Sequence, residues 1–62
     1  MNFQLKLNNE KLESLKGQLV YVNEMIVSNI KDWEIIEYKA TKTVIENDIT
    51  ETKELIERIK LL

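Results

Sequence analysis

The chain has 62 residues, a net charge of −2 and 32% charged residues. A chain of this length forms one domain at most and buries only about 60% of its unfolded surface, so a single copy has little net stability. It contains no cysteine and no histidine, which excludes disulfides and removes the most common ligands of structural metal sites. The composition therefore predicts that association with another chain completes the core.

Charge and hydropathy patterning narrow the class of protein further. Acidic and basic residues are interspersed, so no segment has the one-sided positive charge that suits a phosphate backbone, and nucleic acid is disfavoured as a partner. The longest uninterrupted apolar run, "LVYV", is far shorter than the roughly 20 residues of a membrane span. "MNFQLKL" also lacks the apolar core of a signal peptide. We expect a cytoplasmic protein without membrane contact.

The first predicted element is an amphipathic helix over residues 9 to 29, approximately. Asn8 and Asn9 are candidate caps for its start, and Glu10 and Glu13 are expected near its positive end. Its apolar residues recur in alternating steps of three and four, which places them in one row on one helix face. This row, the first seam, consists of Leu12, Leu15, Leu19, Val22 and Ile26.

A second seam with the same spacing begins at Ile35 and predicts a helix over residues 33 to 61, approximately. Two of its positions are polar, Lys42 and Thr52. The two seams are out of register by two residues, which swings the apolar face by roughly 200° and cannot be absorbed by a change in coiled-coil winding. The chain is therefore expected to turn between them. The apolar members expected in the core or dimer seam are Ile45, Ile49, Ile56 and Ile59.

The predicted turn covers residues 29 to 32. Asn29 tolerates the left-handed conformation that often ends a helix, and Asp32 is a candidate cap for the second helix, with Glu34 in its first turn. The predicted fold is all-α: an antiparallel two-helix hairpin that occupies residues 1 to 62 as one domain and pairs with a second copy into a dimeric four-helix bundle.

Two alternatives remain open from the sequence. Trp33, Ile36, Ala40 and Val44 also continue the first seam, which would move the break to Asn47 and Asp48, where "ENDITE" matches a capping box. Separately, "FQLKL" and "GQLVYV" have the alternation of short strands, so a strand over residues 3 to 7 is a second alternative.

The residue types indicate no catalysis, cofactor or metal site. Without histidine and cysteine, the common general base and the best nucleophile are absent. The carboxylates are spread over polar helix faces, and "ENDITE" lacks the spacing and the glycine of a calcium loop. No glycine-rich loop is present to hold a phosphate. We expect the protein not to be an enzyme.

The most informative feature is the set of apolar residues outside the seams. Tyr21, Met25 and Val27 lie off the first seam, and Trp33 lies beside the turn; contiguous exposed apolar residues usually mark a partner site. We expect these four residues to bind another protein, so that the homodimer acts as a small regulator or inhibitor. Two rival hypotheses are a nucleic-acid-binding bundle of Rop-like architecture and a structural assembly subunit.

Overall fold

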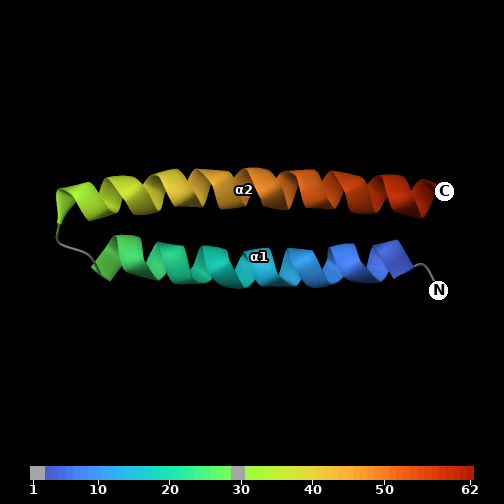
Figure 1. Ribbon diagram of the computed structural model, residues 1–62, viewed down its shortest axis with the longest axis horizontal. Coiled ribbons are helices and arrows are strands. Elements are labelled where there is room, and N and C mark those ends of the chain that lie inside the picture. The colour runs from blue at the N-terminus through green and yellow to red at the C-terminus, as the bar shows by residue number, and fades with distance from the viewer. Residues whose placement is uncertain (1–2, 29–30) are drawn as a thin grey trace.

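The computed structural model describes residues 3–28 and 31–62, and all regular structure in this part of the chain is helical. Helix α1 spans Phe3–Ser28 and helix α2 spans Asp32–Leu61. The helices lie side by side and antiparallel, with the beginning of α1 and the end of α2 at one end, which we call the open end (Figure 1). The Cα atoms extend over 47 × 14 × 11 Å, so the two-helix hairpin that the sequence predicts is confirmed.

Helix α1 begins at Phe3, well before the expected start near residue 9. The segment "FQLKL" is therefore helical, and the alternative of a strand over residues 3 to 7 is wrong. Asn8 does not cap the helix, because its Nδ2 donates to the Gln4 carbonyl one turn earlier, at 2.8 Å. The first turn of α1 holds no acidic residue. Leu5 is half-buried, so packing against α2 extends the helix beyond the local capping signals.

The chain turns immediately before α2. The role expected of Asn29 lies outside the described residues. Asp32 is not the cap but the first residue of α2, and the N-cap is Lys31 in an extended conformation, with φ −97° and ψ 121°. The Lys31 carbonyl accepts hydrogen bonds from the backbone N–H groups of Glu34 and Ile35, both at 3.1 Å. Asp32 and Glu34 place negative charge at the positive end of α2.

Helix α2 is continuous through the middle of its sequence. Asn47 and Asp48 lie within the helix, so the alternative of a break at these residues is wrong. The Thr50 hydroxyl donates to the Glu46 carbonyl at 3.1 Å, across this segment and one helical turn back. The capping-box pattern of "ENDITE" is therefore overridden by the unbroken second seam, whose residues pack against α1.

The core is the single layer of side chains between the two helices. Ile45 is 6% exposed and forms a buried cluster with Leu15 and Val22 of α1. Toward the open end, Ile56 and Ile59 are also buried. No described side chain is less than 2% exposed, because each core residue is covered by one neighbouring helix only. Half-buried residues that pack against the cluster are Leu19, Ile26, Tyr38 and Ile49, and Leu12 is half-buried farther along α1.

Polar residues interrupt the core toward the open end. Thr52, 3% exposed, is the least exposed of the described residues, and Asn8 is half-buried on α1. Because α1 ends at Ser28 and α2 begins at Asp32, antiparallel pairing places these two residues at the same level of the hairpin. A polar layer of this kind disfavours registers that would set either residue against a leucine or isoleucine. Lys42 is half-buried, as a lysine is when its stem lies along apolar surface.

Gly17 offers a direct test of the long first helix. It is an exposed residue inside α1, and a Cβ atom added to it meets nothing within 4 Å. We expect Gly17→Ala to raise the free energy of unfolding by about 1 kcal/mol, because alanine loses less backbone entropy than glycine on entering a helix. Urea denaturation followed by circular dichroism measures this change. The reverse substitution Ala40→Gly, at an exposed site of α2, should lower the stability by a similar amount; equal stability of both variants contradicts the prediction.

Candidate interaction surface

Large apolar side chains are exposed on both helices in the half of the hairpin next to the turn. Val27 of α1 is 86% exposed, and Trp33 and Ile36 of α2 are 59% and 67% exposed. Helix geometry explains this exposure: Leu19, Val22 and Ile26 face α2, and at about 100° per residue their neighbours must point elsewhere. We call the set the turn-proximal surface. It consists of Val20, Tyr21, Met25, Val27, Trp33, Ile36 and Val44, of which Met25 is half-buried and the others are exposed.

The charge distribution of α1 changes along its length. From Gly17 to Ser28 the helix has one charged residue, Glu24. The preceding part of α1 is rich in charge, so covering it with another protein would remove many ionised groups from water. Burial of the turn-proximal part of α1 carries little such desolvation cost. The charged residues of the preceding part are Lys6, Glu10, Lys11, Glu13 and Lys16.

Trp33 lies at the turn end of the hairpin, in the first turn of α2. The Lys31 Nζ is 6.0 Å from the centroid of the indole ring and 3.9 Å from the Glu34 Oε1. At exposed sites both contacts contribute only small stabilisation, on the order of 0.5 to 1 kcal/mol for the cation–π contact. Trp33 is thus an exposed aromatic side chain on a rigid helix, which is the usual form of an interface anchor.

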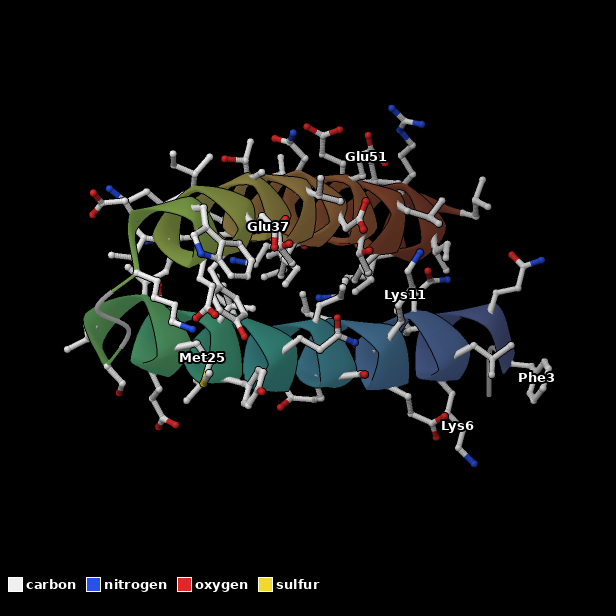
Figure 2. All side chains as sticks on the ribbon, turned by 60° about the vertical axis from the view of Figure 1, so that its left-hand side comes forward. Phe3, Lys6, Lys11, Met25, Glu37 and Glu51 are labelled. Atoms are coloured by element: carbon white, nitrogen blue, oxygen red, sulfur yellow. The ribbon has the colours of Figure 1, made fainter. Side chains whose placement is uncertain are left out.

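The four residues expected at the partner surface do not lie together. Tyr21 and Met25 lie on one side of the α1 seam and Val27 lies on the other, as the helical repeat requires, while Trp33 lies at the tip. Figure 2 shows Met25 of α1 and Glu37 of α2 on the same side of the hairpin. We call this side the Tyr21 face, and its apolar residues are Leu7, Tyr21, Met25, Val44 and Leu55. The opposite side, the Ile36 face, has Val20, Val27 and Ile36 as its apolar residues.

Sequence reasoning did not assign Val20, Ile36 or Val44 to a partner surface. Ile36 and Val44 fit a continuation of the first seam equally well, and only the turn before α2 places them on the outside. The second seam is the signal that identifies Ile36 and Val44 as outward-facing residues. A residue one position after a seam residue, such as Ile36 after Ile35, points away from the core of the hairpin.

The lysines of the Ile36 face are interleaved with acidic residues. Lys60 Nζ lies 3.7 Å from Glu57 Oε1, and Lys16 Nζ lies 3.6 Å from Glu13 Oε1, one turn away in each helix. These exposed pairs contribute little to stability. They do keep the lysines from forming the uninterrupted basic patch that phosphate binding favours.

Within residues 3–28 and 31–62, no group of three or more acidic, histidine or cysteine residues is placed to hold a metal ion. Neither of the two described helices combines the length and the apolarity that crossing a bilayer requires.

Compared with known proteins, this chain matches no protein-family model, no curated protein and no solved structure.

Proposed function

We propose that this chain is a non-enzymatic regulator or inhibitor in the cytoplasm, which acts as a homodimeric four-helix bundle and binds another protein through part of its turn-proximal surface. The observation that carries the proposal is the exposure of large apolar side chains on both sides of the hairpin next to the turn. Soluble proteins rarely expose contiguous apolar surface unless a partner covers it. Because one partner cannot cover opposite sides of the hairpin, the proposal includes two partners: a second copy and a target protein.

The outer side of α2 supports a mode of target binding. Trp33, Ile36 and Ala40 are exposed and recur at steps of three and four, the pattern by which a helix lays an apolar row into a groove of another protein. Val27 is exposed at the turn end of the neighbouring helix. The target is therefore proposed to offer an apolar groove, with Trp33 as the main anchor.

Capture of the target by a matched pair of variants tests this function. Ile36→Glu places a charge in the proposed contact, whereas Thr50→Glu places the same charge on the same side of α2, farther from the turn at another exposed position. Immobilised protein is first used to identify the target in extracts of the source cells. Calorimetry with the purified target then measures each dissociation constant. We expect Ile36→Glu to weaken binding at least 100-fold, by analogy with the loss of interface hot spots.

The Thr50→Glu variant should bind as the original chain does, and circular dichroism should find both variants equally helical. If Ile36→Glu binds the target as tightly as Thr50→Glu does, the outer side of α2 is not the binding site. Failure to retain any target with the original chain, in extracts of the source cells, counts against a protein-binding function altogether.

A further inference from the structure

We infer that the Tyr21 face binds a second copy of this chain, packed antiparallel about a two-fold axis near Val44. This inference deepens the proposed function and rests on its homodimer. It assigns Tyr21 and Met25 to the contact between copies and leaves Trp33, Val27 and Ile36 for the target protein.

The hairpin exposes more surface than a compact protein of the same mass does. Its accessible surface is 4923 Å² for a mass of 7.4 kDa, whereas a compact monomeric protein of that mass exposes about 4200 Å². The excess is roughly 700 Å², close to the approximately 800 Å² that each partner contributes to a standard interface. One contact with a second copy therefore restores the exposure that is typical of a compact fold.

The apolar residues are distributed differently along the two sides of the hairpin. On the Tyr21 face they occur along the whole hairpin, from Leu55 near the open end through Val44 in the middle to Met25 near the turn. The α1 row on this face, from Leu7 to Met25 in steps of four and three, contains one charged residue, Lys11. A partner as long as the hairpin itself fits such a stripe.

The Ile36 face is a poor match for a full-length partner. Its apolar residues lie only next to the turn, and on that side one α2 residue beside the seam in each seven-residue repeat is charged. Covering them would desolvate several charges. These residues are Lys39, Glu46, Lys53 and Lys60.

Charge favours the antiparallel sense of the pair. On the Tyr21 face, Glu34 and Glu37 lie near the turn and Arg58 lies near the open end. A parallel pair would place Glu37 of both copies at the same level, where like charges repel. An antiparallel pair about Val44 brings Arg58 of each copy to the acidic end of the other and Leu55 to the level of the other copy's Met25, while Glu37 lies at the level of the other copy's Glu51.

Single-cysteine variants test the face, because the chain contains no cysteine of its own. We expect Val44→Cys to form covalent dimers with a short bismaleimide, since two copies of this residue lie near the two-fold axis. The matched control is Ile36→Cys, whose site is exposed to a similar degree, 67% against 60% for Val44, but lies on the other side. Linkage of Ile36→Cys without linkage of Val44→Cys overturns the inference.

Spin labels on Ser28→Cys test the sense of the pair. In the antiparallel dimer the two labels lie toward opposite ends, separated along the hairpin by roughly 36 Å, which is twice the rise of about 1.5 Å per residue over the 12 residues from Asp32 to Val44, and pulsed electron paramagnetic resonance measures that distance. Labels that are close together indicate a parallel pair and refute the proposed sense. Sedimentation equilibrium at the same concentrations completes the test. A 7.4-kDa monomer overturns the inference, and the binding comparison of Ile36→Glu with Thr50→Glu then still decides whether the chain binds a target.

Discussion

Ile45→Ala is expected to lower the free energy of unfolding by about 2 to 5 kcal/mol, the usual range for truncating a buried isoleucine. Ile45 is 6% exposed and lies in the cluster with Leu15 and Val22. The hairpin has only one layer of core residues, so no second layer can relax into the cavity. A domain of this size typically has about 3 to 9 kcal/mol of stability in total, so the substitution should remove a large share of it.

The identical substitution at Ile36 is the control, because it removes the same atoms from a side chain that is 67% exposed. Urea titration followed by circular dichroism should give a loss for Ile36→Ala within about 0.5 kcal/mol, as for ordinary surface changes. Equal losses at the two positions would falsify the orientation of α2 described above, since they require both isoleucines to be equally covered.

Proline substitutions should also have large effects on stability, and they distinguish the turn before α2 from a break at Asn47 and Asp48. Asn47→Pro is expected to cost about 3 kcal/mol or more, because proline inside a helix removes one backbone hydrogen bond and clashes with the preceding turn. Asp32→Pro should be tolerated. Asp32 is the first residue of α2, a position that favours proline, and the preceding Lys31 already has the extended conformation, φ −97° and ψ 121°, that a following proline demands.

Thermal unfolding by circular dichroism compares the two proline variants directly. A lower midpoint for Asp32→Pro than for Asn47→Pro is incompatible with a turn before residue 32 and a continuous helix through residue 47. The pair of variants is informative because both sites are in polar segments, so neither substitution removes apolar side chains from the core.

The hairpin architecture could be predicted because it follows from the spacing of the apolar residues. A two-residue slip between the seams forces the apolar face to opposite sides of any straight helix, and a turn is the only arrangement that reunites the two faces. The ends of the helices were less predictable. Asn8 has the chemistry of a cap, but within α1 its side chain donates to the Gln4 carbonyl instead, and the choice between these roles depends on the packing of Leu5, seven residues before Leu12, the first residue assigned to the seam.

The candidate interaction surface was less accessible from sequence than the fold. Tyr21 and Val27 are both off the seam, yet the sequence does not say that they flank it on opposite sides until the antiparallel partner of α1 is known. Ile36 and Val44 posed a different difficulty. Each fits a continuation of the first seam but lies off the second, and the assignment depends on where the chain turns, which is a property of the whole hairpin and not of the residues nearby.

The position of the turn near the middle of the chain has a kinetic consequence. Contacts next to the turn, such as those around Val22 and Tyr38, close short loops, whereas contacts between Leu5 and the segment around Ile56 close loops that include most of the chain. Loop-closure entropy rises with loop length, and helical folds with local contacts form rapidly. The helices should therefore associate first at the turn and then pair progressively toward the termini. Amide hydrogen exchange should follow the reverse order, fastest at the open end and slowest around Val22 and Ile45.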